Sequence, residues 1–373
     1  MEDKKYLFKC INCGHETSEY CIKCPVCGGK MQIVYNNLTW KIENKIPSMW
    51  RYKNMLPLSK RLVSFGEGLT PLKRINGILC KLETRNPSGS YADRSSSAIL
   101  SNLEYNSFKL NYIEDFALSF SYYARKIGKN VDVKVDPEMV DPQELILLSR
   151  LGVKISFKSN KDVLLKEITY DNPYTIEGLK TISYEIYEKS LKEYKIFVPA
   201  QSGTLVYAIG KGLYELKNMR KDFPEFELIA VKLKRTEIPE IINSSNYKIK
   251  IMSVSSEEAM ESMIKLSKKG LNVKPLASVS YALAMIEGNG IAIITGKGKN
   301  SLNLTMKDTD LSKDIINLLS DGNKRTAYEI WLQLGKYSLK GVYRSLESLS
   351  KHGRICENFE MKGERKIKFY GIC

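Results

Sequence analysis

Two pairs of cysteines near the N-terminus have the spacing of a metal site. Cys10 and Cys13 form one Cys-x-x-Cys pair, Cys24 and Cys27 form a second, and glycine follows each pair. The glycines let backbone amides turn back toward the sulfur atoms, so four thiolates can surround one tetrahedral ion. We expect structural zinc at these four cysteines, with iron as the alternative metal. A site closed by four thiolates leaves no position open for a substrate.

The other potential metal ligands nearby do not fit this pattern. Five of the eight cysteines lie within residues 10–27, and such clustering favours a metal site over disulfide bonds. Cys21 and His15 lie between the two pairs, and we expect neither to bind the metal. Residues 1–35 are therefore predicted to form a zinc ribbon.

A second group of motifs follows the cysteine-rich segment. They read Ser-Phe-Gly-Glu-Gly-Leu-Thr-Pro-Leu at 64–72 and Lys-Leu-Glu-Thr-Arg-Asn-Pro-Ser-Gly-Ser-Tyr at 81–91, and continue at 172–181, 208–216, 255–259 and 294–298. In this order they resemble the motifs of threonine synthase, a pyridoxal-phosphate enzyme of the tryptophan-synthase-β-like fold, or fold type II. The resemblance covers residues 1–305, because some members of that family also begin with a zinc ribbon. It implies an α/β core of two subdomains and a homodimer.

One position in the second motif departs from the family. Threonine synthases have a lysine between the aromatic residue and the Asp-Arg pair, and that lysine forms the Schiff base with the cofactor. In this chain Ala92 stands there, between Tyr91 and Asp93. A methyl group can neither form an imine nor move protons at the carbon atoms of a substrate. We therefore assign no residue a catalytic role.

Two ligand-binding loops of the family are also altered. The loop that binds the substrate carboxylate corresponds to residues 111–115, where glycine has become Ile113 and asparagine has become Glu114. A carboxylate at this place would repel a substrate carboxylate. The phosphate loop corresponds to residues 199–205, before a helix whose N-terminus would cradle phosphate, and one glycine of three remains. The residues still suited to line a ligand pocket are Ser202, Gly203, Thr204, Thr295 and Glu114.

These three departures predict a pseudoenzyme, not an enzyme. We expect no tethered pyridoxal phosphate, because the amine that would hold it is missing. The central region would then serve for dimerisation or for sensing a small-molecule effector such as an amino acid.

The last part of the chain has the pattern of a nucleic-acid-binding domain. Apolar residues recur at Leu339, Val342, Leu346 and Leu349 and give one buried stripe on a helix. Two strand patterns follow around residues 361–364. Three helices followed by a hairpin resemble winged-helix domains, whose third helix enters the major groove of DNA. The residues expected to contact DNA are Lys336, Ser338, Lys340, Arg344, Ser345, Ser348, Lys362, Arg365 and Lys366.

Charge and composition agree with this interpretation. The 373 residues carry a net charge of +16, which favours polyanions such as double-stranded DNA. A lysine-rich surface unrelated to DNA is the alternative explanation. The sequence has no apolar run of about 18 residues and begins with a charged segment. We therefore expect a cytoplasmic protein with no membrane contact.

The elements that must position these residues follow from the hydrophobic pattern. Short apolar runs alternate with longer amphipathic segments over residues 36–305, which predicts a mainly parallel sheet covered by helices on both faces. In the last region Thr326 and Glu329 form a capping box and Gly335 ends the same helix. The predicted domains are a zinc ribbon at 1–35, a threonine-synthase-like domain at 36–305 and a winged helix-turn-helix domain at 306–373.

Three functional hypotheses follow. The first is a DNA-binding transcriptional regulator on a catalytically inactive domain. The second is a threonine-synthase-like lyase that uses pyridoxal phosphate and has relocated its base, with Lys81 or Lys297 as the substitute amine. The third is an inactive relative that modulates a partner protein.

Overall fold

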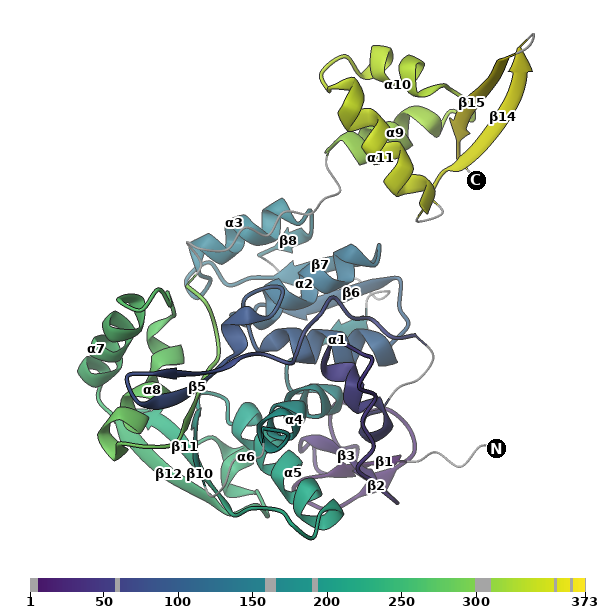
Figure 1. Ribbon diagram of the computed structural model, residues 1–373. Helices are drawn as coiled ribbons and strands as arrows, with labels where there is room; N and C mark the ends of the chain where they lie inside the picture. Colours follow the sequence, from purple (N-terminus) through teal and green to yellow (C-terminus); the bar gives the residue numbers. More distant parts are fainter. Residues whose placement is uncertain are drawn as a thin grey trace. The chain divides into compact units, whose positions relative to one another are not determined.

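The computed structural model describes residues 6–57, 61–157, 166–189, 194–298, 310–351, 354–362 and 365–372. The chain divides into two compact units, Met1–Leu304 and Thr305–Cys373. Figure 1 shows the helices and strands of both units.

A small antiparallel sheet carries the cysteine pairs. Its strands stand in the order β2-β1-β3 and comprise β1 (Tyr6–Cys10), β2 (Glu16–Thr17) and β3 (Met31–Tyr35). Phe8 and Ile33 are buried on the side that faces the rest of the first unit, and the Phe8 ring makes an edge contact with the ring of Tyr174. The cysteine-rich segment is thus docked on the α/β core through apolar side chains.

The larger sheet of the core has six strands in the order β12-β11-β10-β13-β5-β4. All neighbouring pairs are parallel except β4 with β5. The strands are β4 (Leu72–Ile75), β5 (Ile78–Leu82), β10 (Tyr194–Pro199), β11 (Phe226–Leu233), β12 (Ile249–Val254) and β13 (Ile291–Ile294). All four residues of β13 are buried, which explains why this strand reads as a continuous apolar run.

The direction in which strands are added to this sheet reverses at β10. Helices α5 (Thr204–Met219) and α6 (Glu240–Asn243) lead from β10 outward to β12, whereas α7 (Ser256–Ser267) and α8 (Pro275–Glu287) lead back to β13 on the other side of β10. Right-handed crossovers therefore place α5 and α8 on opposite faces. Such a reversal leaves a crevice at the carboxyl ends of the strands, the usual ligand position in α/β folds.

The smaller sheet of the core has four parallel strands in the order β8-β7-β6-β9. They are β6 (Ser107–Asn111), β7 (Asn130–Lys134), β8 (Lys154–Ser156) and β9 (Lys166–Ile168). The helices around this sheet and between the two sheets are α1 (Ala92–Asn102), α2 (Phe116–Lys126), α3 (Pro142–Arg150) and α4 (Pro173–Tyr187), with the short turns η1 (Met49–Met55) and η2 (Glu83–Arg85). The core therefore has two sheets, which agrees with the two subdomains that the resemblance implies.

Local sequence explains where several helices begin. Asn172 accepts a hydrogen bond from the Tyr174 amide, and Pro173 occupies the first helical position of α4. Asp141 and Pro142 start α3 in the same way. These caps satisfy amide groups that have no partner within the helix.

The second compact unit contains three helices and a hairpin. These are α9 (Asp310–Leu319), α10 (Ala327–Leu334), α11 (Leu339–Lys351), β14 (Cys356–Lys362) and β15 (Arg365–Gly371), and β14 pairs with β15 antiparallel. Val342, Leu346 and Leu349 are buried in its core, as the apolar stripe predicted. The capping box of Thr326 and Glu329 is also confirmed at the start of α10.

Four strands of the core, β4, β5, β6 and β9, were not predicted from sequence. The edge strand β4 pairs antiparallel with β5, and β6 pairs with β9 in the smaller sheet. All four have three to five residues, too few for a clear hydrophobic period. Among the described residues, no helix combines the length and the apolar character needed to cross a membrane.

Candidate functional sites

The four cysteine sulfur atoms predicted to bind metal lie together. Cys10 Sγ is 3.5 Å from Cys27 Sγ, Cys13 Sγ is 3.6 Å from Cys24 Sγ, and all four lie within 4.8 Å of one another. Thiolates bound to one zinc ion at about 2.3 Å would stand about 3.8 Å apart. Gly14, after the first pair, has φ of +75°, the left-handed conformation that the turn needs. The cluster therefore fits a tetrahedral ion.

A small pocket lies at the carboxyl ends of β10 and β13, where the strand order reverses. Its wall contains Ser202, Thr295 and Glu114, which were predicted from sequence, together with Asp115 and Lys274. The cavity volume is about 50 Å³, whereas pockets for cofactor-sized ligands measure roughly 300–1,000 Å³. In this arrangement the pocket has no room for a ring-sized cofactor.

Gly203 and Thr204, the other two predicted pocket residues, lie behind this wall at the start of α5. Gly203 has φ of +75°, and a Cβ added there would lie 2.6 Å from the side chain of Ile241, so this position requires glycine. Thr204 Oγ1 donates a hydrogen bond to Asp171 Oδ1 at 3.1 Å. Amides at a helix N-terminus attract anions, but the carboxylate of Asp171 partly opposes that attraction.

Lys274, which the sequence did not single out, forms ion pairs at the pocket. Its Nζ contacts Glu114 Oε1 and lies 2.8 Å from Asp115 Oδ1. Asp115 has φ of +67° and ψ of −46°, which is rare for a residue other than glycine. Glu114 and Asp115 follow a strand of the smaller sheet, whereas Lys274 precedes α8, so these ion pairs link the two sheets.

The same ion pair also borders a second hollow. Glu114, Lys274 and Leu276 line both the small pocket and an adjoining cavity of about 480 Å³. The Lys274–Glu114 pair therefore borders both the outer cavity and the inner pocket.

Ala92 is the first residue of α1 and is fully buried. Its neighbour Tyr91 lines the small pocket, whereas Ala92 does not. Because a methyl group offers no amine, the residues do not fit a cofactor attached at this position. An attached cofactor would require an amine from another element and a wider pocket.

The two lysines considered as substitutes lie elsewhere. Lys81 Nζ is 2.7 Å from the Thr70 carbonyl oxygen and 2.5 Å from Glu185 Oε2, and only 2% of its side chain is exposed. Lys297 donates its backbone amide to the Gly89 carbonyl and is not part of the pocket wall. Of Lys81, Lys297 and Lys274, only Lys274 lines the pocket.

Several residues of the family-like motifs form a buried ionic cluster. The Arg94 guanidinium bonds both Glu83 and Glu185, and all three side chains are almost fully buried. Burial by itself would raise the pKa of Glu185, but Arg94 and Lys81 lower it to about 2. Removing one charge would leave its partners buried without compensation. These motif residues therefore support the packing of α1 against α4.

Asp93 directly precedes Arg94 of this cluster, but its pKa shifts in the opposite direction from that of Glu185. Burial raises the pKa of Asp93 to about 7, although hydrogen bonds from Ser119 and Ser88 lower it in part. Ser119 Oγ donates to Oδ1 at 2.6 Å, and the Ser88 amide donates to Oδ2 at 2.6 Å. The protonated carboxyl is thus the favoured form in the folded chain below neutral pH.

Asp93→Asn is expected to flatten the pH dependence of stability. The folded pKa of Asp93 is raised, so its contribution to stability is complete below pH 4 and is lost as pH rises through about 7. Asparagine mimics the protonated acid, because its amide can donate to the hydroxyls while its oxygen accepts from the Ser88 amide. Relative to the variant, the wild type should lose about 2 kcal/mol between pH 5 and 7. Urea denaturation at pH 5, 6, 7 and 8 measures this; parallel profiles would refute it.

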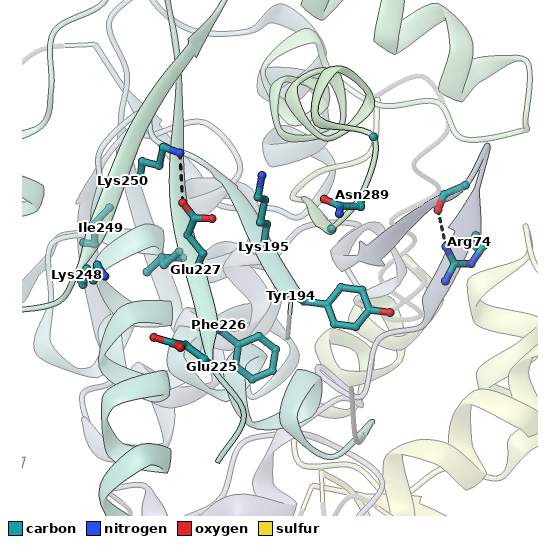
Figure 2. Close-up of a pocket in the computed structure, with 14 residues that line it drawn as sticks. Arg74, Tyr194, Lys195, Glu225, Phe226, Glu227, Lys248, Ile249, Lys250 and Asn289 are labelled. Carbon is teal, nitrogen blue, oxygen red and sulfur yellow. Dashed lines mark hydrogen bonds and ion pairs between the residues drawn. The ribbon is translucent and has the colours of Figure 1, made fainter. Parts of the chain in front are cut away.

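A larger cavity, of about 880 Å³, lies at the opposite edge of the six-stranded sheet. Figure 2 shows Tyr194, Lys195, Glu227 and Lys250 around it, at the amino ends of β10, β11 and β12. Lys250 Nζ lies 3.3 Å from Glu227 Oε1, and Lys195 pairs with Glu287. Because α/β sheets bind ligands at carboxyl ends, we assign the ligand site to the smaller pocket.

The helix α11 presents a polar face to solvent. Lys340, Arg344 and Ser348 are exposed there, as predicted. Tyr343, which the sequence analysis missed, is 51% exposed on the same face. Ser338 accepts a hydrogen bond from the Gly341 amide at 3.2 Å and so caps the helix.

The other predictions for this unit have separate outcomes. Ser345 is buried and shares a hydrogen bond with Ser312 of α9 at 2.7 Å, so its assignment to the exposed face was wrong. Lys336 is exposed but pairs with Asp314 at 2.9 Å, which offsets its charge. The side chains of Lys362, Arg365 and Lys366 lie outside the described residues.

The comparisons with known proteins concern the first unit. A family model described as "Pyridoxal-phosphate dependent enzyme" matches residues 63–239. Threonine synthase from Methanosarcina acetivorans is 29% identical over 248 residues, 57% of this chain and 61% of that protein. Threonine synthase from Methanocaldococcus jannaschii is 26% identical over 251 residues, with the same shares. The matched part thus spans about 61% of the length of these relatives.

Solved structures show the same fold at lower identity. Threonine deaminase isoform 2 from Solanum lycopersicum has a TM-score of 0.52 and 14% identity, over 63% of this chain and 80% of that chain. Serine racemase from maize has a TM-score of 0.50 and 15% identity, over 61% of this chain and 85% of that chain. At such identities the likeness establishes the fold alone.

These comparisons overturn the prediction that the chain is not an enzyme. Both the matching family and the curated relatives are enzymes, and the family depends on pyridoxal phosphate. The prediction came from three departures, namely Ala92 at the lysine position and the changes in the two ligand-binding loops, but another element brings the amine of Lys274 into the pocket. The expectation that pyridoxal phosphate does not bind likewise finds no support in the family. Residues 63–239 therefore match the family of pyridoxal-phosphate-dependent enzymes, and the first unit shares the α/β fold of these solved structures.

Proposed function

We propose that the protein is a DNA-binding transcriptional regulator whose pyridoxal-phosphate-enzyme-like domain holds an effector site. The observation that carries this proposal is the outward face of α11, where Lys340, Tyr343, Arg344 and Ser348 are exposed together. The opposite face of the helix is buried in the core of its own unit. A helix held in this way can enter the major groove of DNA.

The side chains on this face suit nucleic acid. Lys340 and Arg344 are one turn apart and provide cations for phosphate oxygens. Tyr343 and Ser348 supply hydroxyl groups for phosphates or base edges. The hairpin of β14 and β15 would form the wing of a winged-helix domain. A homodimer would present two such helices to a two-fold-related DNA site.

The central domain would contribute the effector site and the zinc ribbon its structural metal. The small pocket offers hydroxyls from Ser202 and Thr295 beside the charges of Lys274 and Glu114, a set suited to an amino acid or a similar small molecule. One neighbour in fold is a lysine-to-alanine mutant of O-ureido-L-serine synthase bound to O-ureido-L-serine, at 13% identity and a TM-score of 0.52. A lysine-to-alanine change in this fold is therefore compatible with a bound amino acid.

A gel shift of the full chain on genomic fragments tests DNA binding. We expect a retarded band on selected fragments at low salt that weakens steeply as salt is raised, because phosphate contacts release counterions. The absence of any shift at low salt would refute the proposal.

A second function, catalysis by a threonine-synthase-like lyase, is favoured by the comparisons. They support catalysis more directly than DNA binding, because the named relatives are enzymes. The specific observation is Lys274, whose amine lies in the wall of the pocket. Covalent attachment of pyridoxal phosphate there would require the Lys274 ammonium to leave Glu114 and Asp115 and lose a proton.

Covalent labelling decides whether Lys274 serves this role. If it does, the chain mixed with pyridoxal phosphate and reduced with borohydride should carry one adduct, which peptide mass spectrometry places on Lys274. Lys274→Arg should abolish the adduct, because arginine keeps the charge but lacks a reactive amine. Lys297→Arg is the matched control and should retain it. An unlabelled wild-type chain would argue against this second function.

A further inference from the structure

Three side chains of the cysteine-rich segment contact residues near the loop that precedes α5. The first is Lys30, three positions after Cys27. Its Nζ lies 2.9 Å from Asp171 Oδ1, and the same oxygen accepts the hydrogen bond from Thr204 Oγ1 at 3.1 Å. Asp171 therefore joins the second cysteine pair to the first residue of α5.

The second side chain is Asn12, which lies inside the first cysteine pair. Its Nδ2 donates to Glu240 Oε1 at 3.3 Å, and Glu240 is the first residue of α6. The next residue, Ile241, packs directly on Gly203, where an added Cβ would meet it at 2.6 Å. The first cysteine pair is thus connected through α6 to the same loop.

The third side chain is Tyr20, in the segment between the two pairs. Its hydroxyl accepts a hydrogen bond from Asn172 Nδ2 at 2.7 Å, and its ring stacks on Tyr174 with centroids 5.3 Å apart. Asn172 caps α4 and directly follows Asp171. All three contacts therefore converge on the residues that border the N-terminus of α5.

The positions of these three side chains depend on the metal site. The segment between the pairs contains only the two-residue strand β2, and Cys13 and Cys27 are exposed. Segments with so little buried apolar surface open readily. In such ribbons the bound zinc supplies much of the folding free energy. Without metal, Lys30, Asn12 and Tyr20 would lose their defined positions.

We propose that metal binding at the four cysteines regulates the ligand site, because the metal-loaded ribbon holds residues 201–204 in place. We call these residues the anion loop. The inference rests on the proposed zinc site and gives it a regulatory role in addition to a structural one. Ser202 of this loop lines the small pocket, so a loosened loop would weaken the binding of any ligand that contacts it.

Hydrogen–deuterium exchange on the full chain tests the coupling without a known ligand. Removing zinc with a chelator is expected to raise exchange of the amides at 201–206 about tenfold or more, which corresponds to about 1.4 kcal/mol. Peptides that cover β13 serve as the internal control, because this strand is buried at the centre of the sheet.

A variant that keeps its zinc separates the contacts from the metal. Lys30→Met with Asn12→Ala removes two of the three contacts and leaves the cysteines intact. With one zinc still bound, exchange at 201–206 should rise about two- to fivefold, as expected for exposed polar contacts. Lys23→Met is the matched control, since Lys23 is an exposed ribbon lysine and should leave exchange unchanged.

The proposal is overturned if zinc removal leaves exchange at 201–206 unchanged. It is also overturned if zinc removal raises this exchange but the zinc-loaded double variant shows wild-type exchange. If chelation also exposes β13, the whole unit has opened, and the zinc-loaded variant decides the result. A chain that binds no zinc refutes the metal site itself. None of these results depends on DNA binding.

Discussion

Arg344→Ala is expected to weaken the binding of the full chain to its target DNA by about 10- to 100-fold. Arg344 is exposed on α11, one turn from Lys340 and on the face opposite the buried Val342 and Leu346. If it contacts phosphate, the slope of log affinity against log salt should fall by about 1 for each contact removed. Fluorescence anisotropy at several salt concentrations measures both quantities.

Two further variants test the direction of the charge effect on DNA binding and provide a control. Glu347 is an acid on the exposed surface of α11, and Glu347→Gln should strengthen DNA binding severalfold because it removes repulsion from phosphate. Lys265→Ala makes the same charge change as Arg344→Ala at an exposed site on α7 and should have little effect. Equal affinities and salt slopes for Arg344→Ala and the wild type would refute a DNA-reading α11.

Cys24→Ser is expected to release the metal and destabilise the first unit. Cys24 is buried among the four sulfur atoms, and three thiolates bind zinc much more weakly than four. The ribbon is docked on the core through Phe8 and Ile33, so unfolding of the ribbon exposes apolar surface on the ribbon and on the core. We expect the Tm to fall by about 5–10 °C, which corresponds to a few kcal/mol in a unit of this size. Calorimetry and zinc stoichiometry together measure the effect.

Cys21→Ser is the matched control for this variant. Cys21 lies in the same segment but outside the group of four converging sulfur atoms. It should keep one zinc per chain and the wild-type Tm. If the two serine variants behave alike, the four-cysteine site does not bind a structural metal.

The altered pocket and the preserved fold have separate physical causes. Glu83 and Arg94 lie in the family-like motifs and form a buried ionic cluster with Glu185, and loss of any one would leave unpaired buried charge. Glu114 lines the pocket and is partly exposed, and Ala92 carries no charge, so neither position belongs to that cluster. A chain can therefore keep the fold of an enzyme family while the chemistry of its pocket changes.

The metal cluster was predictable because its ligands are close in the sequence. A Cys-x-x-Cys pair with a following glycine brings two sulfur atoms together by local geometry alone, and two such pairs complete the set. The buried stripe on α11 and the capping box at Thr326 were predictable for the same reason, since both depend on spacings of three or four residues.

The contacts that alter the pocket were not predictable in this way. Lys274 and Glu114 are 160 positions apart, and only the tertiary structure brings the residue before α8 next to the segment that follows β6. Ser345 was misplaced for another reason, because its polar side chain suggested an exposed face although its spacing of three from Val342 and four from Leu349 places it on the buried stripe, where it meets Ser312 of α9.

The sequence by itself determined the four converging cysteines, the type and order of most helices and strands, and the missing amine at Ala92, because these depend on residue identity and short spacings. Only the tertiary structure decided which lysine lines the pocket and how far the pocket is closed. Those features arise from pairs of residues that are distant in the chain, and neither periodicity nor spacing contains that information.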